Sequence, residues 1–276
     1  MSYPQDIVEL RVLGARAEVS ARPGYAWPEP GEAVDIRFLL AAPGALPELV
    51  WRFEACLMDA SPDGSVLCRE EAFVEREGEG TPSFRVELPL AAGGAAQLGV
   101  RGVLCETGRL AARGLECESG RRLDAAVRLG IAGEVQNRIP EITEGAFTLD
   151  GTPLSAEQTD RPCDQVAEAP RIASNARATL RLELGASMRE KLPADRRGFD
   201  ALGEHEALRV DWYATLGRLT PAASFIEADA PLADSEVQAS WRAPEVSEPV
   251  WARLFVVARD RRGGSSHLER AVCVMP

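Results

Sequence analysis

Residues 83–88 have the sequence Ser-Phe-Arg-Val-Glu-Leu, and this stretch shows the pattern that dominates the chain. Phe84, Val86 and Leu88 alternate with polar or charged neighbours, which is typical of an antiparallel strand with one buried face. Similar strand-length runs recur between Gly, Pro and Asp, and no long stretch has the 3.6-residue period of a helix. The sequence therefore predicts an all-β fold.

The strand signals fall into two groups along the 276 residues. The first group covers residues 7–13, 33–41, 49–57, 65–70, 83–88, 98–105 and 123–131. The second covers residues 147–149, 178–184, 208–214, 224–228, 237–241, 250–258 and 267–274. About seven short strands in each group are typical of an immunoglobulin-like sandwich. We therefore expect two tandem immunoglobulin-like β-sandwich domains, residues 1–134 and 135–276, with the aperiodic stretch 133–140 as connector.

A tryptophan occupies a corresponding place in each group. Trp51 and Trp212 both lie in the third clear strand of their half. An immunoglobulin-like core uses a buried tryptophan on that strand. The two positions therefore suggest a faint internal repeat, with two unrelated strand tryptophans as the alternative.

Six cysteines allow 15 connectivities, so the count alone does not fix the pairing. Cys56 and Cys68 bracket the turn sequence Pro62-Asp63-Gly64, and a hairpin folded there would place the two cysteines opposite each other. Directly opposed strand residues have Cα atoms about 4.5–5.5 Å apart, within reach of a disulfide. Cys105 and Cys117 have the same twelve-residue separation, which suggests a second pair. Cys163 and Cys273 then remain for each other.

Structural zinc and reduced core cysteines are the alternatives to disulfides. Zinc sites favour Cys-x2-Cys knuckles or mixed Cys/His spacing, and neither pattern is present. Disulfides form in oxidising compartments, so the cysteines indicate an exported protein. Residues 1–6 carry no signal-peptide pattern, so this expectation depends on the cysteines.

Charge disfavours several partners. The formal net charge is −12, from 31 basic and 43 acidic residues. Such an excess repels phosphate backbones and anionic lipid surfaces, so we expect no nucleic-acid partner. The sequence has no run of about 18 apolar residues, the minimum for a membrane-spanning helix.

No residue pattern indicates catalysis, so we expect neither an enzyme nor a cofactor. His205 and His267 are the only histidines, and Ser266 beside His267 in sequence is not a serine triad. Residues 189–193, which include the single lysine Lys191, are expected to be exposed. Residues 75–80 are expected to form a solvated acidic turn. Calcium is the least disfavoured ion, near Asp229, Asp234 and Glu236, although the spacing is not that of a calcium loop.

Two aromatic residues in a Pro- and Gly-rich loop form the best candidate binding site. Tyr25 and Trp27 lie between Pro23-Gly24 and Pro28. Aromatic residues in a loop at the end of a sandwich could stack on sugars or serve as a protein-binding hot spot. The favoured alternative is that Trp27 folds back over the edge of its sandwich.

The second half resembles a bacterial protein family in three stretches. These are Val210-Asp-Trp-Tyr-Ala-Thr-Leu-Gly-Arg-Leu219, Trp241-Arg-Ala-Pro244 and Phe255-Val-Val-Ala-Arg-Asp-Arg-Arg-Gly-Gly264. They resemble the C-terminal repeat of exported Ig-like lipoproteins of myxobacteria-type genomes. The first half is similar to the preceding domain through Leu10-Arg-Val-Leu-Gly-Ala-Arg-Ala-Glu18 and a tryptophan followed by two spaced cysteines. The resemblance implies export, a sandwich fold and an N-terminal lipid anchor, whose cysteine is not among these residues. It implies no reaction.

These features predict a non-enzymatic cell-surface or periplasmic module with a structural, adhesive or scaffold role. A carbohydrate-binding module using Tyr25 and Trp27 is the alternative. A sandwich-fold hydrolase with paired carboxylates is a third possibility, because carboxylates are plentiful. The expected partner is another surface or periplasmic protein, or a glycan, with membrane contact only through a lipid anchor. The expected location is the outer membrane, cell surface or periplasm.

Overall fold

The computed structural model describes residues 4–58, 66, 68, 71–94, 97–133, 135–154, 161–185, 188–191 and 205–276. Strands dominate these ranges, which also hold two short 3-10 helices, η1 (Leu90–Gly94) and η2 (Cys163–Gln165). None of the helices in these ranges is long and apolar enough to cross a membrane. The prediction of an all-β fold is confirmed.

The chain forms two compact units, each a sandwich of two sheets. The first sandwich comprises Leu10–Ile139 together with Arg262–Ser265, and the second comprises Met1–Glu9, Pro140–Arg261 and Ser266–Pro276. The sequence suggested two contiguous segments that meet at residue 134. The contacts instead place the division after Ile139, and each unit includes a short segment that is remote in sequence.

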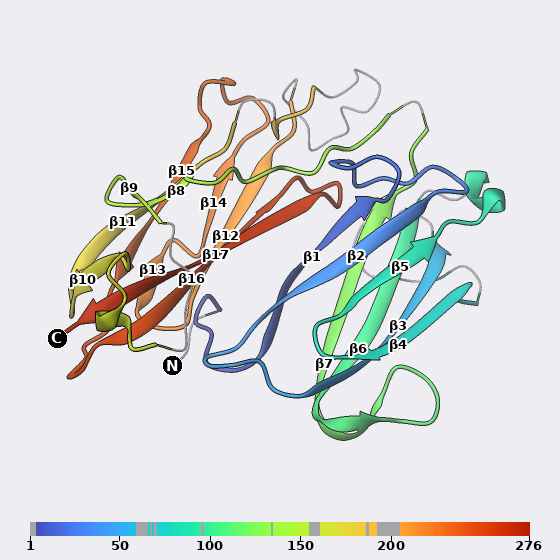
Figure 1. Cartoon of the computed structure of the whole chain (residues 1–276). Helices are drawn as coiled ribbons and strands as arrows, with labels where there is room; N and C mark the ends of the chain where they lie inside the picture. The colour runs from blue at the N-terminus through green and yellow to red at the C-terminus, as the bar shows by residue number, and fades with distance from the viewer. Residues whose placement is uncertain are drawn as a thin grey trace. The chain divides into compact units, whose positions relative to one another are not determined.

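The first sandwich packs a three-stranded sheet against a four-stranded sheet (Figure 1). The three-stranded sheet has the order β1-β2-β5, formed by β1 (Arg11–Val19), β2 (Ala33–Ala41) and β5 (Ser83–Glu87). The four-stranded sheet has the order β4-β3-β6-β7, formed by β4 (Val74–Glu79), β3 (Leu49–Met58), β6 (Gln97–Leu110) and β7 (Cys117–Gly130). Phe38 and Phe53 stack between the sheets with ring centroids 4.6 Å apart.

Strand β1 lies further along the chain than expected. The sequence suggested residues 7–13, but β1 runs from Arg11 to Val19 and pairs with β2. Its core-facing residues Ala15 and Ala17 are too small to give a strong hydrophobic signal. Ile7 is fully buried, but it belongs to the second sandwich, where its N–H donates to the Ala214 carbonyl at 2.9 Å.

The expected acidic turn at residues 75–80 is wrong. Those residues lie mostly in strand β4, which pairs antiparallel with β3 from Val74 opposite Ala55 to Glu79 opposite Val50. An edge strand can carry many charges when they face solvent. Here Arg52 of β3 also forms ion pairs with Glu75 at 3.2 Å and Glu77 at 2.5 Å. The strand expected at 65–70 falls mostly outside the described residues, and neither Val66 nor Cys68 lies in a strand.

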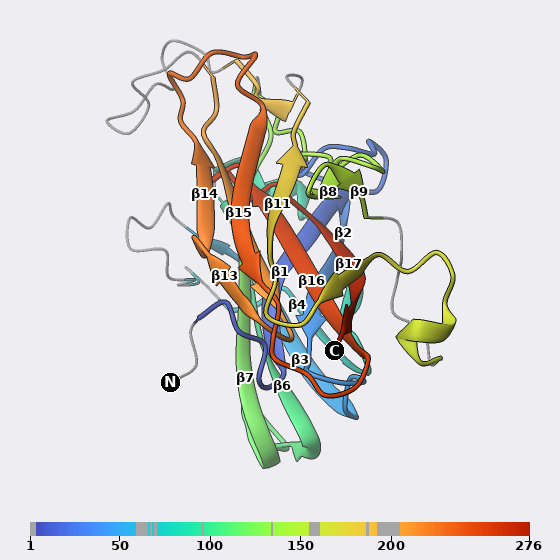
Figure 2. The ribbon, with the colours of Figure 1, turned by 90° about the vertical axis from the view of Figure 1, so that its left-hand side faces the viewer.

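The second sandwich has two five-stranded sheets, and Figure 2 shows β11 beside β15 in one of them. That sheet has the order β13-β15-β11-β8-β9, formed by β13 (Arg218–Thr220), β15 (Glu236–Arg242), β11 (Arg177–Glu183), β8 (Phe147–Leu149) and β9 (Thr152–Pro153). The other has the order β10-β17-β16-β12-β14, formed by β10 (Arg171–Ala173), β17 (Ser265–Met275), β16 (Val250–Arg259), β12 (Leu208–Ala214) and β14 (Ala223–Ile226). Strands β9, β10 and β13 have three residues or fewer, too short for a periodic signal.

Both strand tryptophans are buried as predicted, Trp51 in β3 and Trp212 in β12. The sequence also predicts aliphatic and aromatic packing around Trp212, from Leu180, Leu182, Phe255 and Val257. Leu180 and Leu182 do share the core of the second sandwich with Trp212. Phe255 and Val257 instead lie on the opposite face of β16, and Leu254 and Val256 take their place. Because residues 254–258 are all apolar, the sequence does not show which alternate set points inward.

Three disulfides are present, and they are the links that the cysteine spacing suggested. Cys56–Cys68, Cys105–Cys117 and Cys163–Cys273 have Cα–Cα distances of 5.5, 5.7 and 5.4 Å. The expected turn at Pro62-Asp63-Gly64 lies outside the described residues. Cys163 precedes β10, which pairs in parallel with β17, the strand that holds Cys273. Three disulfides and no free cysteine are typical of a chain that folds in an oxidising, extracytoplasmic compartment.

Candidate functional site

The loop that carries Tyr25 and Trp27 connects β1 to β2 in the first sandwich. Backbone hydrogen bonds hold it at several points. The N–H of Val19 donates to Tyr25 O at 2.8 Å, that of Ala26 to Asn137 O at 2.8 Å, and that of Ile139 to Gly24 O at 2.8 Å. The loop is therefore anchored to the segment at residues 137–139, which the sequence suggested was only a connector.

Trp27 packs against the core of the first sandwich instead of facing solvent as a free platform. Its indole N–H donates to the carbonyl oxygen of Arg262 at 2.8 Å. The guanidinium of the same arginine lies 4.4 Å from the ring centroid. Gly130 leaves the room that the ring needs, because a Cβ there would overlap the indole. The ring is thus held by its own sandwich, as the favoured alternative for this residue supposed.

Tyr25 is also held by arginines. The guanidinium carbons of Arg22 and Arg138 lie 5.5 and 5.4 Å from its ring centroid. Arg138 also donates to the tyrosine hydroxyl at 3.3 Å. Cation–π contacts of this kind stabilise the ring position and compete with a sugar for the aromatic face.

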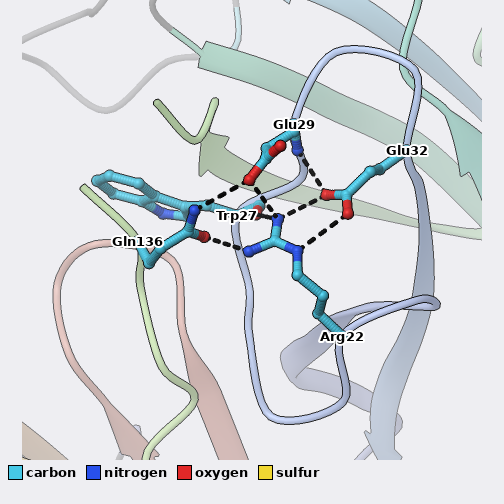
Figure 3. Close-up of polar contacts among 5 residues, drawn as sticks. All are labelled: Arg22, Trp27, Glu29, Glu32 and Gln136. Carbon is cyan, nitrogen blue, oxygen red and sulfur yellow. Dashed lines mark hydrogen bonds and ion pairs between the residues drawn. The ribbon is translucent and has the colours of Figure 1, made fainter. Parts of the chain in front are cut away.

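Arg22 organises the polar side of this loop (Figure 3). Its guanidinium donates to both carboxylate oxygens of Glu32, at 2.9 and 2.5 Å, to the Trp27 carbonyl at 3.1 Å, and to the side chain of Gln136. Glu29 lies 3.7 Å from the guanidinium and accepts from Gln136 at 3.2 Å. The hydrogen bonds from Arg22 lower the pKa of the Glu32 carboxyl, and those to Glu32 raise the pKa of Arg22. Hydrogen bonds and ion pairs thus join the five residues of Figure 3 in one network, which is the arrangement of a structural brace.

The loop suggested for calcium surrounds an arginine. Arg189 was expected to be exposed, but it is 4% exposed. Its guanidinium donates to five carbonyl oxygens, those of Glu206, Glu227, Ala228, Ala230 and Pro231, at 2.7–3.2 Å. The charges of Asp229 and Asp234 act on it and oppose the lowering of its pKa by burial. A cation is therefore already built into this loop, so its carbonyls are not available to an ion.

Neither histidine joins a catalytic group in the described ranges. His205 pairs through its backbone with Lys191 in an isolated bridge, and His267 lies in β17. Among the described residues, no cluster of three or more His, Cys, Asp or Glu side chains could hold a metal ion.

A groove lies on the outer face of the four-stranded sheet, away from the core side chains. Its volume is about 560 Å³, within the range of known ligand clefts. It is lined by residues of three strands and two loops: Glu54, Val66, Arg101, Gly102, Gly114, Leu115, Arg122, Asp124, Ala125 and Ala126. In the register of the sheet, Glu54 lies opposite Arg101, and Arg101 lies opposite Ala126.

Described residues from two disulfide-linked segments border the groove. Val66 comes from the segment linked by Cys56–Cys68 and lies over Gly99. A Cβ atom added at Gly99 would lie only 2.7 Å from the Cγ1 atom of Val66. Gly114 and Leu115 come from the β6–β7 connection, beside Cys105–Cys117. Within that connection the Ala111 N–H donates to Glu116 O at 3.0 Å. The Cys105–Cys117 link and this hydrogen bond therefore hold the part of the β6–β7 connection that borders the groove.

Two ion pairs mark the polar part of the groove. Arg101 contacts Glu54 at 3.2 Å, and Arg122 contacts Asp124 at 2.6 Å. The side chains of Arg101, Arg122 and Asp124 are 43%, 47% and 70% exposed, so they are accessible to a ligand. Sequence reasoning missed this site because its residues come from β3, β6 and β7, and none carries a local motif.

These features define a disulfide-bonded protein of two tandem β-sandwiches with a surface groove on the first. No family model and no curated protein matches the chain. Among solved structures, red sea bream transglutaminase matches at 11% identity and a TM-score of 0.27, over 98% of this chain and 32% of that one, so the chain spans about a third of that enzyme. Fibronectin(III)-like modules of Clostridium thermocellum CbhA match at 10% identity and a TM-score of 0.22, over 94% and 93% of the two chains. The tandem V-type regions of a v-region-containing chitin binding protein match at 10% identity and a TM-score of 0.28, over 98% and 100%.

Proposed function

We propose that this chain is a non-catalytic, extracytoplasmic module that binds a partner at the bacterial surface or in the periplasm, in a structural, adhesive or scaffold role. The observation that carries this proposal is the groove, which the β6–β7 connection borders at Gly114 and Leu115 beside the Cys105–Cys117 link. Fixed loops lower the entropy cost of binding, and that cost limits affinity at open surfaces. The groove offers charged side chains and a shallow floor, which suits recognition more than chemistry.

The resemblance to exported Ig-like lipoproteins supports the proposed location. Two of its motifs have structural roles: Trp241 is fully buried, and its indole N–H donates to Leu216 O at 3.1 Å. Gly263 adopts a φ of +105°, which disfavours any residue with a Cβ at this turn. The proposal therefore includes an outer-membrane lipid anchor on the natural precursor.

Carbohydrate binding by Tyr25 and Trp27 is the weaker proposal. Sugar stacking needs an open aromatic face, and guanidinium groups lie over both rings. A glycan would have to displace Arg262 from Trp27 and break the network of Figure 3. A glycan array in which Trp27→Ala abolishes a signal without unfolding the chain would restore this candidate.

Cell fractionation tests the proposed location. Antibody labelling of intact cells of the native organism, with and without added protease, should detect the chain outside the cytoplasm. Lipid extraction after metabolic labelling with a fatty-acid analogue should report the anchor. A chain found only in the soluble cytoplasmic fraction, with alkylatable thiols, would contradict the proposal.

A further inference from the structure

We infer that the tip of the β6–β7 hairpin is a redox-sensitive strap. Residues 109–119, which we call the strap, lie folded over the outer face of their own sheet, and the Cys105–Cys117 disulfide holds them there. A dithiol that reduces this disulfide releases the strap. The inference goes beyond the proposed function, because it needs neither a lipid anchor nor a bound partner.

The strand register shows that the hairpin folds back on itself. In the ladder between β6 and β7, Cys105 lies opposite Arg122, and Cys117 lies five positions before Arg122 on the same strand. In a straight hairpin, these positions at about 3.4 Å each would separate the two cysteines by about 17 Å. Their Cα atoms are 5.7 Å apart. The disulfide is therefore no ordinary cross-strand link, and it closes a bend in the hairpin.

A β-bulge at the base of the strap supplies the bend. The register shifts here, so that Thr107 and Gly108 of β6 stand against Gly120 of β7. Gly120 has a φ of +84°, and a Cβ atom added at Gly108 would lie 2.0 Å from the carbonyl oxygen of Ser119. Glycine at both positions lets the two backbones approach this closely. Because a bulge bends its strand and redirects the residues beyond it, the strap leaves the plane of the sheet at this point.

The strap covers part of the outer face of β6. Leu104 packs in the core of the sandwich, so its neighbours Val103 and Cys105 point to the outer face. Both are nevertheless 0% exposed. Arg52 lies opposite Val103 in the register and donates to the carbonyl oxygen of Gly114 in the strap at 2.6 Å. The strap is thus bonded to Cys105 and reaches the residue opposite Val103, so it lies where both need cover.

The disulfide is the firmest hold on the strap. In the range 107–120, all of which the structure describes, no residue is fully buried, and Leu110 and Leu115 are only partly buried. Segments with little buried apolar surface open readily. The hydrogen bond from Arg52 can be exchanged for one to water, whereas the covalent link cannot. Reduction therefore opens the strap and leaves the ladder from Glu106 onward in place.

The redox step is a two-electron exchange with a dithiol. Cys117 is partly exposed and Cys105 is 0% exposed, so a thiolate attacks Sγ of Cys117 and Cys105 leaves as the thiolate. The second thiol of the reductant then displaces Cys117 from the mixed disulfide. The dithiol becomes a disulfide, and its two protons end on Cys105 and Cys117. Cys163 and Cys273 are 1% and 0% exposed, which protects their link from the same attack.

Release of the strap changes the surface of the four-stranded sheet. Gly114 and Leu115 of the strap line the groove on that face, so the wall that they form is present only while the link is closed. Val103 and Cys105 become accessible at the same time. The strap thus couples the oxidation state of one disulfide to the shape of this surface.

The test follows the reactivity of Cys105 in the full chain. Cys117→Ser leaves Cys105 as a free thiol, and Cys163→Ser leaves Cys273 as the matched control, since both residues are 0% exposed in the linked chain. We expect a maleimide to label Cys105 at least a hundredfold faster than Cys273. Amides of residues 109–119 should exchange at least tenfold faster in Cys117→Ser than in the wild type, while those of β2 should keep their rates.

The wild-type chain tests the redox step itself. Treatment with dithiothreitol, followed by alkylation and peptide mapping, should open Cys105–Cys117 before Cys163–Cys273. Amide exchange in the strap should become faster as the first link opens, and reoxidation should restore the slow exchange. Simultaneous opening of the two links, or exchange in the strap that does not follow the state of Cys105–Cys117, would overturn the inference.

The variants can overturn it in two further ways. If Cys105 in Cys117→Ser is as protected as Cys273 in Cys163→Ser, the strap stays closed without its link. If amide exchange in β2 also becomes faster in Cys117→Ser, the link holds the whole sandwich together and the hairpin tip is no separate strap.

Discussion

Arg52 donates a hydrogen bond of 2.6 Å from Nη1 to the carbonyl oxygen of Gly114. This bond connects the middle of the four-stranded sheet to the β6–β7 connection that forms one wall of the groove. Arg52 is 6% exposed and also pairs with Glu75 and Glu77 of the edge strand. One side chain therefore holds both the edge strand and the wall in place.

Replacement of Arg52 by Leu should loosen this wall. The hydrogen bond to Gly114 and the pairs with two half-exposed carboxylates are lost, at a cost of about 1–2 kcal/mol. Hydrogen exchange of the amides in residues 111–116 should become faster, and the melting temperature should fall. Arg101→Leu is the matched control, because it removes an exposed ion pair on the next strand and should cost about 0.5 kcal/mol or less. Equal exchange in the two variants would contradict the role given to Arg52.

Trp27 and Gly130 should be energetically coupled. Trp27→Ala should lower the free energy of unfolding by about 2–3 kcal/mol, since it removes a large ring packed against the core. Gly130→Ala should cost about 1–3 kcal/mol, because its methyl group overlaps that ring. In the double variant the cost of Gly130→Ala should shrink, since the overlap has gone. Additive costs in urea unfolding would show that the ring does not occupy this position.

The Arg22–Glu32 pair should make stability depend on pH in the acid range. The pKa of Glu32 is lower in the folded chain than its ordinary value of 4.5, so the pair stabilises the fold above that value. The contribution is lost as the pH falls through the lowered pKa. Glu32→Gln should therefore cost about 1–2 kcal/mol at pH 7 and progressively less as the pH falls below the ordinary value of 4.5 and through the lowered pKa. A difference between variant and wild type that stays constant throughout the acid titration would exclude this linkage.

The long-range disulfide should stabilise the second sandwich. Cys163 and Cys273 close a loop with a sequence separation of 110, for which the chain-entropy model gives at most about 4–5 kcal/mol. Cys163→Ser with Cys273→Ser in the full chain should lower the melting temperature of that sandwich by several degrees or more. Calorimetry can separate the two sandwiches if they melt independently. If neither melting transition shifts in the variant, the Cys163–Cys273 disulfide does not stabilise the second sandwich.

The sequence predicts those parts of the fold whose signals are local. The pairing of Cys56 with Cys68 follows from a sequence separation of 12 and from the turn sequence between them. The alternation of apolar and polar residues in 83–88 identifies β5 directly. Strand β4 was missed because Glu75, Glu77 and Glu79 satisfy their charges in solvent or through Arg52, a partner remote in sequence. The inward face of β16 was assigned wrongly because residues 254–258 are uniformly apolar.

The candidate sites were harder to predict, because they depend on tertiary contacts. Tyr25 and Trp27 stand out in sequence as aromatic loop residues, yet Arg138 and Arg262, more than a hundred positions away, cover their rings. Arg189 carries no pattern that would reveal its five carbonyl partners. The groove depends on the register of three strands and on two disulfides, so no single segment of the sequence contains it.

The oxidation state of the cysteines in the native chain tests the account most directly. Protein isolated from its own organism under alkylating, non-reducing conditions should show no free thiol and a mass six hydrogen atoms below that of the reduced chain. Peptide mapping should recover Cys56–Cys68, Cys105–Cys117 and Cys163–Cys273 as the three links. Two or more alkylated cysteines in freshly isolated protein, or a different pairing, would contradict both the extracytoplasmic location and the fixed walls of the groove.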